Sequence, residues 1–422
     1  MDKQFKITEN DIRLLPYSPV NEDDTVEIRC QVFNSGEDGE TEVEFLFDGE
    51  KIHAEKLYIK SNSYGFVKCP LPIENKAGNH EISINGVSLP LEVKKEKKVL
   101  LDGGFLMIGP PNDRHVCDSF RDDVKKFTDD MWAQYVDALN DINQTCLVIQ
   151  ATHQYLNLEY ENRIYHGSIV AHYDSACNPK SDICAHDPVK AILETAEKNG
   201  QHVFVGVGNQ YGYGGTKEEM KELLDRYGKY TSFYGWYLSC EFNMSNFNPE
   251  KLDNFQDLVE YAREIAPVKP ILISPFGLPS EECINYLLDH DIFDIMMAQD
   301  CVGQKRVTVS ESDKMHKTLL EACEKINKHL WANCESFNFT EEIGKTTFVY
   351  SDENNLVPRF RDGGFDGEEG FVQQMQAVRP YVEKILTFAF TGLFSPDNLP
   401  IVPGGAPAVE QYKKYVKYMN KI

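Results

Sequence analysis

Two glutamates in this sequence stand where apolar runs end. Glu241 closes the run FYGWYLSCE, and Glu335 closes the run HLWANCE. A charged side chain at such a place is costly to bury unless it is paired or used in chemistry. Two carboxyls about 5–5.5 Å apart are what retaining hydrolysis of a glycosidic bond requires, with one as nucleophile and the other as general acid and base. The alternative is that each glutamate caps a helix or pairs with an arginine.

The elements that must bring these glutamates together are predicted from residue 99 onward. Short apolar runs there alternate with amphipathic stretches, which is the pattern of strand–helix units on a parallel sheet. The eight runs are 99–109, 145–151, 202–208, 233–239, 269–275, 293–299, 329–335 and 385–390. Eight repeats predict an α/β fold, the (β/α)8 TIM barrel, whose catalytic residues lie at the carboxyl ends of the strands. An open doubly wound sheet is the alternative, but IGPPNDRH after the first run is not a Gly-rich nucleotide loop.

In such a barrel, strands four and seven face each other across the ring, so Glu241 and Glu335 can both lean over its mouth. Candidates for substrate binding are the other polar or aromatic residues at or near the ends of the runs: Asp113, Arg114, Gln150, His153, Asn209, Tyr211, Asn243, Gln299, Asp300, Trp331 and Phe337. Loop capping is the alternative for Asp113 and Arg114, and a structural pair at the rim for Gln299 and Asp300. Aromatic rings could stack on sugar rings, although packing in the core is favoured for Trp331 because it lies inside an apolar run.

The sequence predicts neither a metal site nor a cofactor site. Its 11 cysteines occur without a CxxC pair, whereas structural zinc is held by closely spaced ligand pairs. The stretch 157–186 contains several histidines and cysteines, but their spacing matches no standard metal site. Because this stretch exceeds the usual length of a connection, it is interpreted as a lid or a subsite wall.

Residues 1–96 predict a separate all-β domain. Alternating segments such as TVEIRCQVF and EVEFLF are separated by turn signals such as NSGEDGE and ENKAGN, a pattern typical of an antiparallel sandwich. This region resembles bacterial immunoglobulin-like modules of the cell-adhesion-related type. We expect it to serve in packing or spacing, with glycan or partner binding as the alternative, and we expect residues 97–422 to form the barrel domain.

The composition disfavours two classes of partner. The chain has 43 Lys and Arg against 67 Asp and Glu, a formal charge of −24 at pH 7, which opposes attraction to phosphate backbones and anionic lipids. No window approaches the ~20 consecutive apolar residues of a membrane span. We therefore expect neither nucleic acid nor a membrane as partner, whereas the pair Glu241 and Glu335 leads us to expect a carbohydrate. The start of the sequence lacks the features of a signal peptide, which predicts a cytoplasmic protein as written, or a secreted one if a leader was trimmed.

Several motifs resemble those of one protein family. The runs LDGGFLMIGPP, FYGWYLSCE, ILISPFG, IMMAQDCVG and LWANCESF are similar to a bacterial TIM-barrel domain family of largely unknown function, related to the 4/7 superfamily (clan A) of glycoside hydrolases. The resemblance spans most of residues 99–400 and implies that Glu241 is the acid/base and Glu335 the nucleophile. One departure is Cys240, which stands where many clan members have an Asn that contacts the sugar 2-hydroxyl. Asn209 or Asn243 would have to replace that contact.

The leading hypothesis is therefore a retaining glycoside hydrolase that cleaves an oligosaccharide or a glycoconjugate. The second is a metal-dependent sugar isomerase or epimerase, with Glu241, Asp300 and Glu335 as oxygen ligands. Against it, no histidine closes strand five or six, where such sites commonly recruit one. The third is a non-catalytic carbohydrate-binding protein. The separation of the Glu241 and Glu335 carboxyls distinguishes a retaining from an inverting hydrolase.

Overall fold

The computed structural model describes residues 4–109, 118–156, 168–208, 215–239, 241–304, 306–339, 356–358, 365, 367 and 370–422. The chain divides into two compact units: Met1–Lys98 with Asp257–Pro270, and Val99–Gln256 with Ile271–Ile422. The domain boundary expected between residues 96 and 97 stays a prediction.

The first unit contains two β-sheets. Its strands are β1 (Phe5–Lys6), β2 (Ile12–Leu15), β3 (Val20–Asn21), β4 (Val26–Asn34), β5 (Gly39–Phe47), β6 (Glu50–Ile59), β7 (Ser63–Leu71), β8 (Gly78–Ile84) and β9 (Val87–Lys94), with a 3-10 turn, η1 (Glu9–Asp11), before β2. One sheet has the order β1-β4-β2 with β7 also paired to β4, and the other has the order β3-β9-β8-β5-β6. The pairing is antiparallel except between β3 and β9.

The two sheets of the first unit share one apolar core. Ile28 and Val32 of β4 and Val43 and Phe45 of β5 belong to the same cluster of buried side chains. In β5, buried and more exposed residues alternate, because successive side chains of a strand point to opposite faces. The immunoglobulin-like assignment of this unit stays a prediction.

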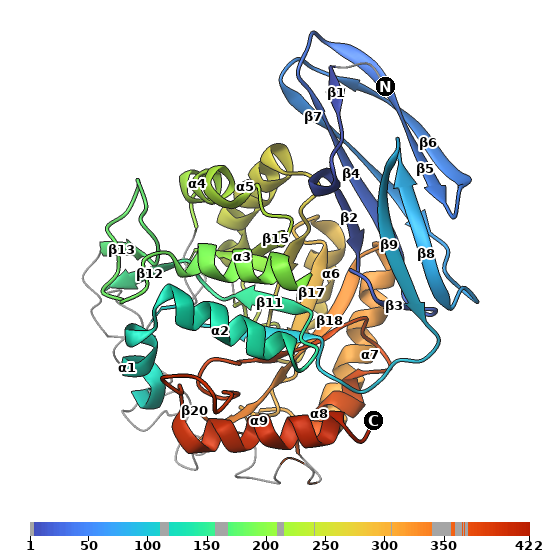
Figure 1. Cartoon of the computed structure of the whole chain (residues 1–422). Coiled ribbons are helices and arrows are strands. Elements are labelled where there is room, and N and C mark those ends of the chain that lie inside the picture. The colour runs from blue at the N-terminus through green and yellow to red at the C-terminus, as the bar shows by residue number, and fades with distance from the viewer. Residues whose placement is uncertain are drawn as a thin grey trace. The chain divides into compact units, whose positions relative to one another are not determined.

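The second unit is built around a closed barrel of eight parallel strands (Figure 1). The strands are β10 (Gly103–Leu106), β11 (Cys146–Ile149), β14 (His202–Val207), β15 (Phe233–Leu238), β16 (Ile271–Ile273), β17 (Ile295–Gln299), β18 (His329–Glu335) and β21 (Ile385–Phe388). Each lies within one of the eight apolar runs, so the predicted barrel is confirmed. The doubly wound alternative is wrong, because β21 pairs with β10 and closes the ring.

Helices alternate with the barrel strands along the chain. They are α1 (Asp118–Lys126), α2 (Asp129–Asn140), α3 (Pro188–Asn199), α4 (Lys217–Tyr227), α5 (Glu250–Ile265), α6 (Glu281–Asp289), α7 (Val309–Lys325), α8 (Phe371–Val378) and α9 (Gly405–Met419). Local sequence sets where several of them begin. At α3, the Asp187 side chain accepts the Lys190 N–H at 3.0 Å, and Pro188 occupies the first turn, where no backbone donor is needed.

Two short antiparallel hairpins extend the barrel connections. β12 (His153–Leu156) pairs with β13 (Ser168–Ala171), and β19 (Phe337–Phe339) pairs with β20 (Leu356–Pro358). The first hairpin contains part of the stretch 157–186 that was expected to form a lid. Within the ranges given above, no helix has the length and apolar character needed to cross a bilayer.

Candidate active site

Three polar residues mark one end of the barrel. Gln299 is the last residue of β17, Glu335 is the last residue of β18, and Glu241 follows shortly after β15. Because the strands of the closed barrel all run parallel, their carboxyl ends meet at the same mouth. This is the end at which TIM-barrel enzymes place their catalytic groups.

The Gln299 side chain contacts Glu241 directly. Its Nε2 donates to Glu241 Oε1 at 3.0 Å and to the backbone oxygen of Ser274, just after β16, also at 3.0 Å. A backbone carbonyl can only accept, so Ser274 fixes which end of the amide faces Glu241. Gln299 is buried, with 5% of its surface exposed, and it therefore presents an immobilised donor to the carboxyl.

Gln304 holds both oxygens of Glu335. Its backbone N–H donates to Glu335 Oε2 at 2.7 Å, and its side-chain Nε2 donates to Oε1 at 2.7 Å. The same Nε2 lies 3.5 Å from Gln299 Oε1. Two glutamine side chains therefore connect Glu241 to Glu335, through a longer contact between the amides and a short one at each carboxyl.

The loop that runs from Gln299, at the end of β17, to Gln304 is tied to β18. Asp300 Oδ1 accepts the backbone N–H of Glu335 at 3.1 Å and that of Val302 at 3.3 Å. Gly303 allows the close approach, since a Cβ there would lie 2.1 Å from the backbone oxygen of Phe337 and 2.8 Å from Glu335 Cβ. A side chain at position 303 would push the loop away from Glu335.

Glu241 is the more accessible of the two carboxyls. Its side chain is exposed to solvent, yet the protein around it displaces enough water to raise the pKa of Glu241 to about 7. The hydrogen bond from Gln299 and the positive charge of Arg306 act in the opposite direction. A carboxyl with this pKa can hold a proton and release it near neutral pH.

Glu335 is almost completely buried, at 1% exposure. Burial raises the pKa of Glu335 well above its usual value, and the nearby charge of Asp300 raises it further. The two hydrogen bonds from Gln304 and the charge of Arg306 oppose this increase, because they favour the ionised form. Gln304 is therefore the residue whose hydrogen bonds most directly favour the ionised form of Glu335.

Arg306 supplies positive charge near both glutamates. Its guanidinium lies over the ring of Phe276, 5.0 Å from the ring centre, and its backbone N–H donates to the oxygen of Cys301 at 3.3 Å. Cys301 has a positive φ of 57°, so the chain turns sharply between Gln299 and Gln304. Within the described part of the chain, no group of three or more His, Cys, Asp or Glu is placed to hold a metal ion.

Three other predicted residues lie near the ends of barrel strands in different environments. Gln150 is buried, and its backbone oxygen accepts the Ser239 hydroxyl at 2.5 Å. Asn243 uses its Oδ1 to accept the backbone N–H groups of Ser245 and Asn246, so that oxygen stabilises a turn. Phe337 is 4% exposed and packs edge-on against Phe388. Their substrate-binding roles stay predictions.

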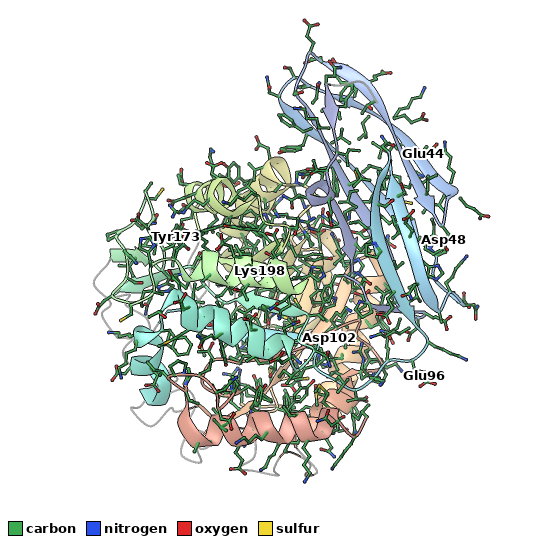
Figure 2. All side chains as sticks on the ribbon, in the orientation of Figure 1. Glu44, Asp48, Glu96, Asp102, Tyr173 and Lys198 are labelled. Atoms are coloured by element: carbon green, nitrogen blue, oxygen red, sulfur yellow. The ribbon has the colours of Figure 1, made fainter. Side chains whose placement is uncertain are left out.

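His153, the first residue of β12, lies inside a buried polar cluster. Its Nδ1 is 3.0 Å from the Thr152 hydroxyl, its Nε2 is 3.4 Å from the hydroxyl of Tyr173, and the same nitrogen is 3.8 Å from Glu219 (Tyr173 is labelled in Figure 2). Burial lowers the pKa of His153 to about 4, so the ring is neutral at pH 7. With 1% of its surface exposed, it packs the hairpin in this structure.

Trp331 takes the packing role rather than a stacking one. It is fully buried, its ring meets Phe204 edge-on at 5.7 Å, and its Nε1 donates to Glu383 at 3.0 Å. Five positions discussed for the site lie outside the described residues. They are the four predicted substrate-binding residues Asp113, Arg114, Asn209 and Tyr211, and Cys240. Sequence reasoning missed Gln304, although it directly follows the quoted motif QDCVG.

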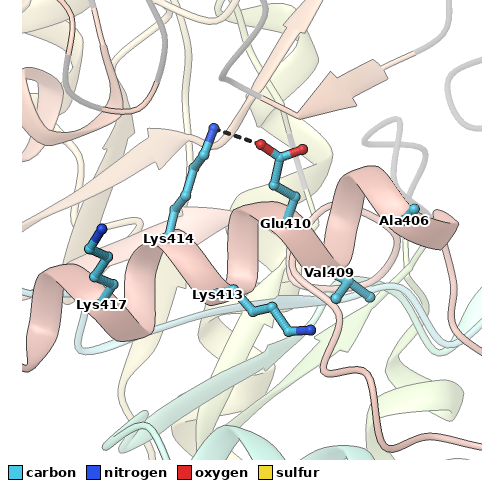
Figure 3. Close-up of a pocket in the computed structure, with 6 residues that line it drawn as sticks. All are labelled: Ala406, Val409, Glu410, Lys413, Lys414 and Lys417. Carbon is cyan, nitrogen blue, oxygen red and sulfur yellow. Dashed lines mark ion pairs between the residues drawn. The ribbon is translucent and has the colours of Figure 1, made fainter.

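A separate surface hollow of about 550 Å³ lies along α9. It is lined by Ala406, Val409, Glu410, Lys413, Lys414 and Lys417 (Figure 3). Its carboxyl, Glu410, pairs with Lys414 at 2.9 Å. A hollow formed by one helix face offers no pair of carboxyls, so the barrel mouth is the better candidate for chemistry.

Comparison with known proteins identifies one family model and several similar folds. The model, described as a domain of unknown function (DUF4434), matches residues 101–400. This match confirms the resemblance to a domain family of unknown function, whereas its relation to clan A stays a prediction. No curated protein matches the sequence.

Among solved structures, one from Bacteroides thetaiotaomicron, described provisionally as an alpha-L-fucosidase, has a TM-score of 0.54 at 17% identity, over 76% of this chain and 95% of that chain. A GH2 beta-galacturonidase from Eisenbergiella tayi has a TM-score of 0.44 at 11% identity, over 94% of this chain and 70% of that chain. A GH99 endo-alpha-mannosidase from Bacteroides thetaiotaomicron has a TM-score of 0.40 at 10% identity, over 69% of this chain and 84% of that chain. The likeness to the first of these concerns the fold.

Proposed function

We propose that this chain, which belongs to the DUF4434 family of domains of unknown function, is a retaining glycoside hydrolase that uses Glu241 and Glu335. The observation that carries the proposal is the connection of these two carboxyls through Gln299 and Gln304 at one mouth of the barrel. Retaining hydrolysis needs one carboxyl that can exchange a proton and another that stays ionised.

The environments of the two glutamates support different roles. Glu241 is accessible and has a pKa of about 7, so it suits a group that protonates the leaving oxygen and later deprotonates water. Glu335 is buried, which raises its pKa, and the two N–H donors from Gln304 oppose that rise and hold the carboxylate in one orientation for attack. We therefore assign Glu241 as acid/base and Glu335 as nucleophile.

The reaction then has two displacements. A Glu335 oxygen bonds to the anomeric carbon while the bond to the leaving oxygen breaks, and that oxygen takes the proton of Glu241. Water next gives a proton to the Glu241 carboxylate and bonds to the anomeric carbon, and the electron pair of the ester bond returns to Glu335. The sugar keeps its anomeric configuration because it is inverted twice.

The substrate is proposed to be an oligosaccharide or a glycoconjugate. The structural relative from Bacteroides thetaiotaomicron is described provisionally as an alpha-L-fucosidase, so a substrate panel should contain aryl α-L-fucosides beside other aryl α- and β-glycosides and natural glycans. Hydrolysis by the wild type and its loss in Glu335→Ala would support the proposal. Equal turnover by both proteins would refute the nucleophile assignment, and binding without turnover would indicate a carbohydrate-binding protein.

A crystal structure would test the mechanism independently. Carboxyls of Glu241 and Glu335 about 5–5.5 Å apart are expected for retention. A separation of about 6.5–9.5 Å would instead indicate inversion, because a water molecule must then fit between the nucleophilic site and the base.

A further inference from the structure

The two hydrogen bonds from Gln304 to Glu335 differ in how easily they can be broken. The donor to Oε2 is a backbone N–H, and its loop is tied to β18 through Asp300 and through the close approach of Gly303. The donor to Oε1 is a side-chain amide, which can rotate. Oε2 therefore has a fixed partner and Oε1 a movable one.

We propose that Gln304 is the positioning residue for Glu335: its backbone N–H holds Oε2 through the whole reaction, and its side-chain amide stabilises the charge on Oε1, the oxygen that attacks. This inference rests on the proposed function. When Oε1 bonds to the anomeric carbon, it loses its negative charge and becomes a much weaker hydrogen-bond acceptor. The group that donates to Oε1 must then move away. Among the two donors, the side-chain amide can do so without moving the loop.

The structure contains an acceptor for the amide when it withdraws. Gln304 Nε2 lies 3.5 Å from Gln299 Oε1, a contact that can shorten as the bond to Glu335 Oε1 is lost. The orientation of Gln299 is fixed independently, because its Nε2 donates to Ser274. A donor that exchanges one acceptor for another avoids the cost of an unsatisfied polar group.

Gln304→Met tests this role, because it keeps the length of the side chain and removes the donor. The free-enzyme pKa of Glu335 should rise, so the acidic limb of the kcat/KM profile should move to higher pH by about one unit, and kcat/KM on that limb should fall by up to about tenfold. Gln304→Glu should move the limb further, because it adds a second carboxyl beside Glu335. Gln256→Met, at an exposed position on α5, is the matched control and should leave the profile unchanged.

A direct titration separates this inference from the proposed function. Carbon-13 NMR of δ-labelled glutamate, with Glu335→Gln to assign the signal, reports the pKa of Glu335 without any substrate. A higher pKa in Gln304→Met than in the wild type and Gln256→Met supports the positioning role, even if the wild type hydrolyses no glycoside and the proposed function fails. An unchanged pKa of Glu335 in both folded Gln304 variants would overturn it.

Discussion

Gln299 Nε2 lies 3.0 Å from Glu241 Oε1 and donates a hydrogen bond to it. This single contact joins the end of β17 to a residue shortly after β15, and it lowers the pKa of Glu241 against the larger effect of the water displaced by the surrounding protein. The amide also donates to Ser274, so it cannot follow the carboxyl if the carboxyl moves. The contact therefore adjusts the acidity of Glu241 from a fixed position.

Replacing Gln299 should change the basic limb of the pH profile. In Gln299→Met the donor that favours ionised Glu241 is lost, so the pKa of Glu241 should rise from about 7, by about one unit. The acid form would then persist to higher pH, and the basic limb of kcat/KM should move upward. A pH–rate profile checks this, and a basic limb that stays in place or moves downward would contradict the role of Gln299.

Replacing Glu241 should remove general acid catalysis selectively. Glu241→Gln should lower kcat/KM by about 10²- to 10⁴-fold for glycosides with poor leaving groups, and much less for a dinitrophenyl glycoside, which needs little proton transfer. The wild-type activity should decline as pH rises through about 7, where Glu241 loses its proton, and this decline should be absent in the variant. Equal losses with both leaving groups would argue against Glu241 as the acid.

Replacing Glu335 should nearly abolish hydrolysis for every leaving group. Glu335→Gln keeps the volume of the side chain but removes the nucleophile, so kcat should fall by more than about 10³-fold with both activated and poor leaving groups. Azide should partly rescue Glu335→Ala and give a glycosyl azide of inverted configuration. Hydrolysis by Glu335→Gln within tenfold of the wild type would exclude this residue as nucleophile.

Position 303 should tolerate no side chain without a cost to the site. In Gly303→Ala the new Cβ meets the Phe337 oxygen at 2.1 Å, so the loop must move and the free energy of unfolding should fall by about 1–3 kcal/mol. Activity should fall as well, because Gln304 moves away from Glu335. Denaturant unfolding and kinetics measure both effects.

Gly65→Ala provides a comparison in the other unit. There the nearest atoms to a new Cβ belong to the side chains of Ile59 and Leu57, which can shift. We expect a smaller loss of stability and unchanged activity. If Gly303→Ala is as stable and as active as the wild type, the close approach of the loop at Gly303 to β18 contributes neither to stability nor to activity.

The barrel was predictable because its strands are buried along all or nearly all of their length. Runs such as 295–298 and 233–238 are apolar without interruption, as parallel strands covered on both faces are. Glu241, Gln299 and Glu335 were visible for the same reason, since each interrupts or closes an apolar run. Because all strands of the barrel run parallel, a polar residue at the carboxyl end of any strand is expected at the same mouth.

The remaining site residues depend on geometry that no local pattern encodes. Gln304 reaches Glu335 only because the chain turns at Cys301 and because Gly303 lets the loop approach β18. His153, at the start of the hairpin after β11, is buried against Tyr173, an environment that its place after an apolar run did not reveal, and its predicted role in substrate binding stays a prediction. These outcomes follow from contacts between segments far apart in the sequence.

The most direct measurement is the covalent labelling of Glu335. The wild type should be treated with a 2-deoxy-2-fluoro glycosyl fluoride of the sugar that the substrate panel identifies, and its peptides analysed by mass spectrometry. We predict that the peptide containing Glu335 gains the mass of one fluorosugar, and that Glu335→Gln gains none. Hydrolysis of the parent glycoside with no adduct, or with an adduct on a residue other than Glu335, would contradict the account.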